Sequence, residues 1–152
     1  SLDDNEIQDD LDDAMAATGF DQHQHLGAIG FCVGARAVFR TMMRKPDQVV
    51  TGAMWHPSYL CDDQPDSPHT TANDMGGSLF IGMGADDQQQ PVSAHQPFLN
   101  ALADHELVTA KIYPGADHGY TWRGWPSYND AAATDSLAET NTLFTRHLPQ
   151  TK

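Results

Sequence analysis

The stretch Gly30-Phe31-Cys32-Val33-Gly34 decides how this 152-residue chain is interpreted. It has the form G-x-C-x-G and lies between an apolar, strand-like run, Leu26–Phe31, and a helix-like run, Val33–Arg44. A nucleophile held on a sharp strand-to-helix turn needs small residues two positions before and after it. The dipole of the following helix favours the thiolate form of a cysteine at this place. The pattern therefore indicates a nucleophile at Cys32, with a small, inert buried cysteine as the alternative.

Two segments further along the chain carry a carboxylate and a histidine at the ends of apolar runs. Phe80–Asp87 is a short strand-like run that ends in acidic residues, and Pro91 follows four residues after Asp87. Lys111–Tyr120 is a second strand-like run, and its Gly-containing loop carries His118. The chain order nucleophile, acid, histidine is the order found in α/β-hydrolases.

These three segments resemble the nucleophile turn, the acid loop and the histidine loop of the dienelactone hydrolase family. The resemblance extends from about Leu26 to His147, which is nearly the whole chain. It implies an α/β-hydrolase fold and hydrolysis of a small-molecule ester or lactone, with no cofactor. Relative to that family, the chain corresponds to the C-terminal half of the fold, because only about 25 residues precede the nucleophile strand.

The resemblance also implies a role for each candidate site residue. Cys32 is the nucleophile, His118 is the base that takes its proton, and Asp87 orients His118. The spacing to Pro91 favours Asp87 over the neighbouring Asp86. The backbone N–H of Val33 is one donor of the oxyanion hole.

Several family features fall in the half that this chain lacks. They are the second oxyanion donor, an acidic partner of the resting cysteine and an arginine that holds a substrate carboxylate. A further family arginine lies four residues after the histidine, where this chain has Trp122, with Arg123 one position later. This departure argues against binding of a dienelactone-type carboxylate. We expect a substrate pocket near Phe31, Trp122 and Arg123. Trp125 and Tyr128 could join Trp122 in the pocket wall or could cap the core.

Charge and cysteine content restrict the partners and the setting. The net charge is −13, from 21 acidic and 8 basic residues, which argues against nucleic acid and anionic membranes as partners. The sequence contains no run of 18 apolar residues, so it predicts no membrane-spanning helix. Two cysteines are too few for a disulfide framework, and a reactive Cys32 must stay reduced, so we expect a cytoplasmic setting.

Two other sets of residues are less informative. Cys61 stands in a loop rich in proline and aspartate and is expected to be an unreactive free thiol. The histidines have no recognised ligand spacing, so we expect no metal site; those considered are His23, His25, His56 and His69.

Hydrophobic patterning predicts one α/β domain over residues 1–152: a mostly parallel sheet of about four strands flanked by helices. The strand 26–31 should be buried on both faces, and Leu137, Phe144 and Leu148 should point inward. The arginines that recur every four residues from Arg36 should form a solvated face paired with nearby acids. The expected strands are 26–31, 49–55, 78–83 and 107–113; the expected helices are 3–18, 33–44, 93–105 and 129–148; residues 56–77 should form a long loop.

The first strand has lost its expected neighbour, which leaves an apolar edge open to pairing. We therefore expect a homodimer or another self-association through this sheet edge, which buries Leu26, Ile29 and one face of the first helix. Two alternatives to a hydrolase remain. The chain could be a catalytically impaired remnant that acts as an oligomerising or partner-binding module, or it could be one half of a split hydrolase.

Overall fold

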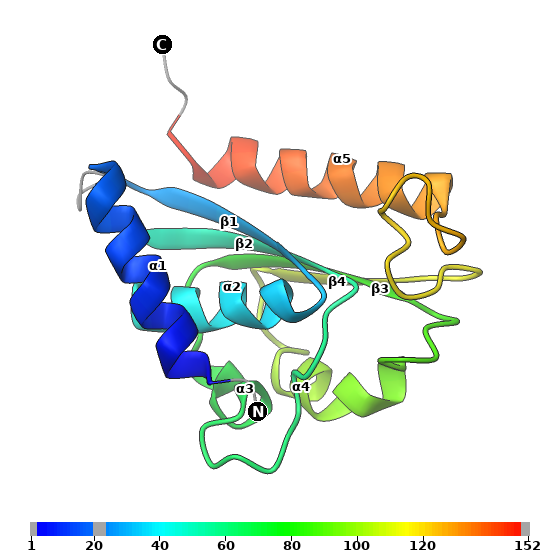
Figure 1. Ribbon diagram of the computed structural model, residues 1–152, viewed down its shortest axis with the longest axis horizontal. Helices are drawn as coiled ribbons and strands as arrows, with labels where there is room; N and C mark the ends of the chain where they lie inside the picture. The colour runs from blue at the N-terminus through cyan, green and yellow to red at the C-terminus, as the bar shows by residue number, and fades with distance from the viewer. Residues whose placement is uncertain (1–2, 20–23, 150–152) are drawn as a thin grey trace.

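A computed structural model describes residues 3–19 and 24–149 of the chain. Its centre is one parallel sheet in which each strand pairs with the next along the chain, in the order β1-β2-β3-β4. This arrangement confirms the predicted four-stranded α/β fold (Figure 1). The strands are β1 (Leu26–Phe31), β2 (Val49–Trp55), β3 (Ser78–Gly84) and β4 (Val108–Tyr113).

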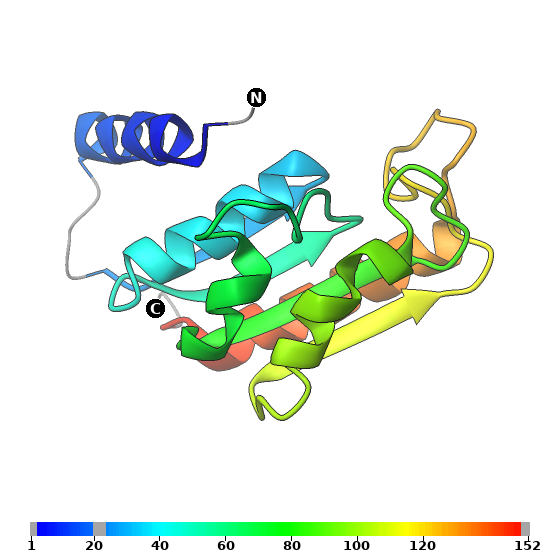
Figure 2. The same cartoon turned by 90° about the horizontal axis from the view of Figure 1, so that it is seen from below.

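Helices cover both faces of the sheet, as Figures 1 and 2 show. The long helix α5 lies alone on one face and packs on β2 and β3, whereas α2 packs on β1 and β2 from the opposite face, together with α3 and α4. Helix α1 contacts α2 and lies outside these three layers. The helices are α1 (Asp4–Thr18), α2 (Val33–Arg44), α3 (Pro68–Thr71), α4 (Gln96–Ala101) and α5 (Asp130–His147), with short 3₁₀ helices at Ala72–Asp74 and Val92–His95.

The sheet separates two clusters of the core, because successive strand residues point to opposite faces. In β2, Met54 points into the larger cluster under α2, while Ala53 and Trp55 belong to the cluster under α5. Every residue of β3 is buried, as expected of a central parallel strand covered on both faces.

The predicted burial of β1 on both faces is wrong. The side chain of Ile29 is 44% exposed, because β1 pairs with β2 alone and ends the sheet among the described residues. On the α5 side the strand is closely covered, since a Cβ added to Gly27 would lie 2.9 Å from a methyl carbon of Leu148.

Three helical expectations also need correction. The predicted helix 93–105 is a 3₁₀ turn followed by the six residues of α4, and the loop 56–77 contains α3 and a 3₁₀ helix. Leu137 does not point inward but is 51% exposed. The buried face of α5 carries small residues instead, and one of them, Thr140, accepts a hydrogen bond of 3.0 Å from the Trp55 indole. A small polar residue fits here because the indole N–H needs a buried acceptor.

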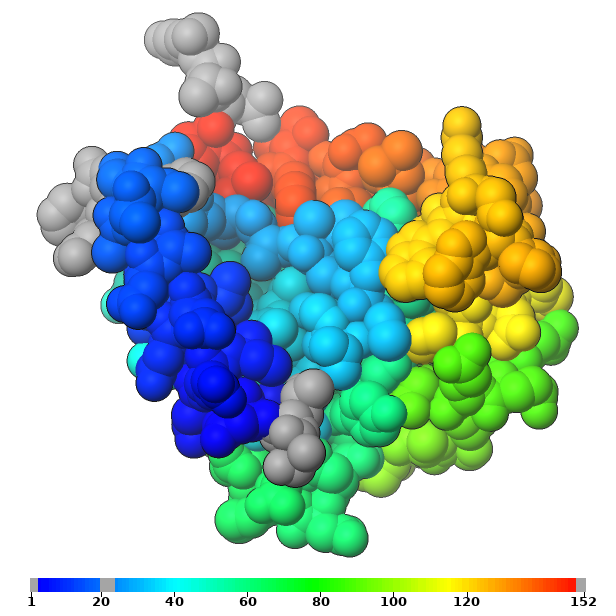
Figure 3. Space-filling view, viewed as in Figure 1, coloured from blue at the N-terminus to red at the C-terminus, as the bar shows by residue number. Residues whose placement is uncertain are grey.

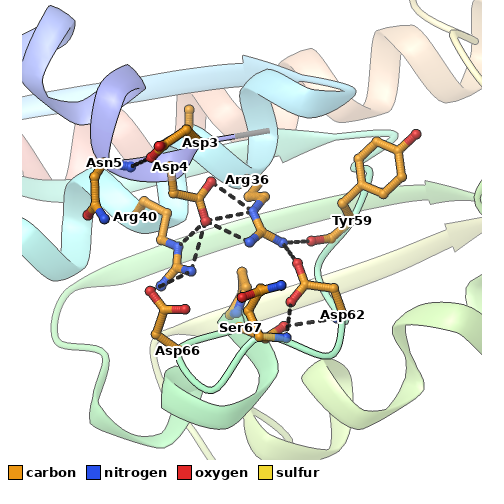
Figure 4. A network of polar contacts seen from close by, with 12 residues as sticks. Asp3, Asp4, Asn5, Arg36, Arg40, Tyr59, Asp62, Asp66 and Ser67 are labelled. Carbon is orange, nitrogen blue, oxygen red and sulfur yellow. Dashed lines mark hydrogen bonds and ion pairs between the residues drawn. The ribbon is translucent and has the colours of Figure 1, made fainter. Parts of the chain in front are cut away.

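Helix α1 is held to α2 mainly by polar contacts. Asp3 caps its first turn, Leu11 is 36% exposed, and the buried residue of the helix is Gln8. The arginines of α2 are paired with acids, as predicted, but Arg36 is 3% exposed and not solvated. Its guanidinium contacts Asp4 of α1 at 2.6 Å and Asp62 at 2.5 Å (Figure 4).

Within residues 3–19 and 24–149, no helix combines the length and the apolar character that crossing a membrane requires.

Candidate active site

The turn between β1 and α2 holds Cys32 in a strained backbone conformation, with φ 54° and ψ −121°. A Cβ added to Gly30 would lie 2.2 Å from the carbonyl oxygen of Gly34, so the tight turn requires glycine at position 30. A Cβ added to Gly34 would meet no described atom within 4 Å. The small residue expected after the cysteine is therefore not required by the described part of this chain.

The three predicted site residues lie at the carboxyl ends of different strands. Cys32 follows β1, Asp87 follows β3 and His118 follows β4. Because the strands are parallel, their carboxyl ends meet at one edge of the sheet, where active sites of open α/β folds form.

Asp87 and His118 are directly hydrogen-bonded. The Nδ1 atom of His118 lies 2.7 Å from Oδ2 of Asp87, and Oδ1 of Asp87 accepts the backbone N–H groups of Gln89 and Gln90 at 2.9 and 2.7 Å. Asp87 is 4% exposed. The neighbouring Asp86 is exposed and its backbone N–H bonds to Ala116. The structure thus pairs His118 with Asp87.

Cys32 and His118 act on each other's protonation. Burial alone would raise the pKa of Cys32, but hydrogen bonds from Ser58, from His118 and from the Val33 N–H lower it overall. Burial alone would lower the pKa of His118, but its hydrogen bonds to Asp87 and Cys32 raise it overall. Both shifts favour a thiolate beside an imidazolium.

Ser58 is a site residue that the sequence did not single out. Its Oγ atom lies 3.2 Å from the Cys32 sulfur, and its side chain comes from the turn after β2. The available signal was topological. The turn after β2 must lie beside the turn after β1, because the two strands are neighbours and parallel.

His56 is a second histidine close to the site. It is 1% exposed, and its ring centre lies 5.2 Å from that of His118. Its Nε2 atom is 2.8 Å from Oγ1 of Thr121. Burial, followed by the nearby His118, lowers the pKa of His56 to about 4, so this ring is neutral at pH 7.

Aromatic side chains surround His118 on its open side. Trp122 is 38% exposed and stacks edge-on against Trp125, with ring centres 4.5 Å apart. Trp125 and Tyr128 line an open cavity of about 340 Å³ together with His118. These rings are therefore part of the site's surroundings and not of the core.

The other two predicted pocket residues have aromatic neighbours of their own. Phe31 packs on Trp55, with ring centres 5.2 Å apart, and also contacts His56. Arg123 is exposed, and its guanidinium lies 5.9 Å from the centre of the Tyr128 ring.

The remaining candidates do not form a second site. Cys61 is a partly buried free thiol, and burial raises its pKa. His23 lies outside the described residues. In the part of the chain that the structure describes, no group of three or more His, Cys, Asp or Glu residues is placed to hold a metal ion.

A parallel sheet with helices on both faces, and a cysteine on a strained turn at the carboxyl end of a strand, defines an α/β-hydrolase fold. The sequence model of the dienelactone hydrolase family matches residues 1–148. The chain belongs to this family.

One curated relative carries a related name, and two solved structures share the fold. A "Putative carboxymethylenebutenolidase" of Synechocystis sp. is 29% identical over 129 residues, covering 82% of this chain and 52% of that protein. A crystal structure titled "Putative Dienelactone Hydrolase" from Klebsiella pneumoniae has a TM-score of 0.76 at 24% identity and covers 92% of this chain and 59% of that one. The crystal structure of a monoacylglycerol lipase of Paleococcus ferrophilus has a TM-score of 0.71 at 13% identity. The match covers 95% of this chain and 76% of that one. The chain thus spans about half the length of the family relatives it matches.

Proposed function

We propose that this chain hydrolyses a small ester or lactone, with Cys32 as nucleophile, His118 as general base and acid, and Asp87 as the residue that orients His118. The observation that carries the proposal is the 2.7 Å hydrogen bond from His118 to the buried Asp87 carboxylate, at the sheet edge where Cys32 follows β1. Against the effect of burial, His118 also lowers the pKa of the Cys32 thiol. The family and its relatives support the same reaction class.

The first step is attack of the Cys32 thiolate on the substrate carbonyl carbon, which forms a carbon–sulfur bond and a tetrahedral oxyanion. The Val33 N–H, next to the sulfur, donates to that oxyanion. Collapse breaks the bond between the carbonyl carbon and the ester oxygen, and the His118 imidazolium gives its proton to the departing oxygen. In a lactone, this oxygen stays on the acyl group.

The second step returns the enzyme to its starting state. Neutral His118 takes a proton from water, and the hydroxide attacks the thioester carbon. The carbon–sulfur bond breaks, the carboxylic acid leaves, and the thiolate is restored beside a protonated His118. Asp87 stabilises that charge through its 2.7 Å hydrogen bond to Nδ1.

The isolated chain should turn over slowly. Helix α1, the described element that precedes β1, packs on α2. We expect no second oxyanion donor from it at the elbow. Loss of one such donor typically lowers the rate by about 10²–10³-fold.

The test is hydrolysis of p-nitrophenyl acetate by the purified chain, by Cys32→Ala and by Cys61→Ala. We expect slow turnover that is lost in Cys32→Ala and retained in Cys61→Ala. Turnover that survives in Cys32→Ala would overturn the proposal. Because Cys32 must remain a thiol, we also propose a reducing, cytoplasmic setting.

A second candidate function follows from the open edge of β1 and from the 52% share of the Synechocystis relative that the chain spans. The chain would then be a binding module or one half of a split hydrolase, completed by strands that dock beside β1. A well-folded chain that binds esters without turning them over would favour this function over the first.

A further inference from the structure

The turn after β2 is strained where it approaches the elbow. Among the described residues other than glycine, positive φ values occur at Cys32 (54°), His56 (38°) and Tyr59 (57°). Such conformations are energetically unfavourable and persist only where surrounding contacts impose them. All three lie around one point, because the residues between His56 and Tyr59 include Ser58, whose hydroxyl is next to the Cys32 sulfur.

Backbone contacts fix this turn without help from the Ser58 side chain. The Ser58 N–H donates to the Cys32 carbonyl at 3.0 Å, and the His56 N–H donates to the Gly82 carbonyl at 2.8 Å. The Tyr59 N–H donates to the Gln90 side chain at 3.0 Å.

A buried arginine fixes the far end of the turn. Arg36 Nη1 donates to the Tyr59 carbonyl, and the guanidinium is itself held by Asp4 and Asp62 (Figure 4). Removing the Ser58 hydroxyl should therefore leave the turn in place.

The Ser58 hydroxyl is 3.2 Å from the sulfur, and Ser58 is 2% exposed. A buried hydroxyl needs a hydrogen-bond partner, and the sulfur occupies that position. Since Nδ1 of His118 is bonded to Asp87, its Nε2 atom is the one left to share the thiol proton. Once that proton is on His118, the sulfur has no proton to donate and can only accept from Ser58.

We propose that Ser58 is a catalytic residue whose hydroxyl donates a hydrogen bond to the Cys32 sulfur and holds it as a thiolate before substrate binds. This inference rests on the proposed function, in which that thiolate is the nucleophile. Hydrogen bonds to a charged partner are stronger than neutral ones, so the hydroxyl stabilises the thiolate more than the thiol.

The other groups around the sulfur are consistent with this role. The Ser58 hydrogen bond is the largest of the contacts that lower the pKa of Cys32 against the effect of burial. His118, from the loop after β4, and the Val33 N–H of α2 also face the sulfur. Behind His118 stand Asp87, His56 and, from the 3₁₀ helix Val92–His95, the buried His95, whose pKa burial lowers.

The test is the rate of Cys32 alkylation by iodoacetamide between pH 4 and 9, followed by peptide mass spectrometry in the full chain, with Cys61 as an internal reference. In Ser58→Ala, the curve of alkylation rate against pH should move to higher pH. At the acid end of that curve, alkylation should slow about tenfold, which corresponds to the loss of one hydrogen bond to a charged group. Ser58→Thr, which keeps a hydroxyl, should stay closer to the unmodified protein than Ser58→Ala. The control Ser93→Ala, at an exposed serine, should change nothing.

An unshifted profile in a folded Ser58→Ala protein would overturn the proposal. If hydrolysis nevertheless fell in that variant, the hydroxyl would act on the substrate and not on the resting thiolate. Alkylation requires no turnover, so the proposed function fails separately: hydrolysis that survives in Cys32→Ala would reject it even if the alkylation profile responded to Ser58→Ala.

Discussion

One oxygen of the Asp87 carboxylate is hydrogen-bonded to His118, and the other accepts hydrogen bonds from two backbone N–H groups. The two backbone bonds, from Gln89 and Gln90, come from the same loop as Asp87 and fix the direction of the oxygen that bonds to His118. His118 is therefore presented to Cys32 by a carboxylate that has little freedom to turn. This relationship joins the loops after β3 and β4 at the sheet edge where Cys32 stands.

We first predict that Asp87→Asn severely impairs hydrolysis. An asparagine side chain carries no charge, and its NH2 group can face Nδ1, which favours the wrong tautomer of the ring. His118 therefore loses the charged partner that orients it and raises its pKa. The loss should be about 10²–10⁴-fold in kcat/KM, as for other triads of this type.

The matched control for this prediction is Asp86→Asn, which removes the same charge one residue away at an exposed position. It should keep nearly full activity. Equal losses in the two variants would show that loop charge matters and the contact to His118 does not. Measurements of kcat/KM over pH 5–9 distinguish these outcomes.

A second prediction concerns the glycines of the elbow. Gly30→Ala should destabilise the fold by about 3 kcal/mol, because the added methyl would meet the Gly34 backbone at 2.2 Å. Gly34→Ala should be neutral or stabilise by up to about 1 kcal/mol, since its methyl meets no described atom and alanine favours helix. Urea denaturation of both variants measures the difference, and equal stabilities would contradict the elbow geometry.

A third prediction concerns the contact between α1 and α2. Asp4→Ala removes a partner of the buried Arg36 and should cost about 2 kcal/mol, moderated by the partners that remain at Asp62 and Tyr59. Asp9→Ala breaks an exposed pair with Arg44, whose side chains are 68% and 39% exposed, and should have little effect. Thermal melts that fail to separate the two variants would contradict the buried role of Arg36.

The same contact sets a pH dependence. Burial alone would raise the pKa of Asp4, but hydrogen bonds from Arg36 and Arg40 lower it below the ordinary value of 3.8. A carboxyl with a depressed pKa in the folded state stabilises the protein fully above its ordinary pKa and loses this effect as pH falls through the folded value. The stability difference between the unmodified chain and Asp4→Ala should therefore shrink below pH 3.8.

The sequence was sufficient for the strands and for the residues at their ends. The apolar runs of β1 to β4 are short, and Gly, Pro or acidic residues stand near their ends. Such residues favour turns and therefore indicate the loops that carry Cys32, Asp87 and His118. Ser58 was missed because its role depends on which strands are neighbours. Spacing along one chain does not show that relationship.

Burial was harder to predict than element type. Leu137 has the helical spacing expected of a core residue, but it lies on the exposed side of α5. Ser136 and Thr140 lie on the buried side of this helix. Arg36 was expected in solvent because arginine usually stays there. It is buried because acids from two separate segments, led by Asp4 and Asp62, surround its guanidinium. Local patterns do not report such long-range compensation.

The last prediction is self-association, which we propose occurs through the edge of β1. Among the described residues this strand pairs only with β2, and Ile29 is 44% exposed along it. Figure 3 shows this side of the molecule, with the β1–α2 segment between α1, α5 and the loop that carries Trp122. Two routes could cover this edge: antiparallel pairing of two β1 strands, or α1 of one copy lying across the other. Helix α1 is held on its own α2, so we favour antiparallel pairing of β1 with β1 of a second copy.

Light scattering coupled to size exclusion should give about twice the 16.6 kDa mass of the chain at micromolar concentration. Ile29→Lys places a charge on the edge strand and should shift the protein to monomer, because a lysine at the edge opposes strand pairing. Leu137→Lys is the matched control: it exchanges an apolar residue of similar exposure on α5, away from the edge, and should leave the dimer intact. A monomeric unmodified chain, or a dimer lost equally in both variants, would show that the β1 edge does not mediate self-association.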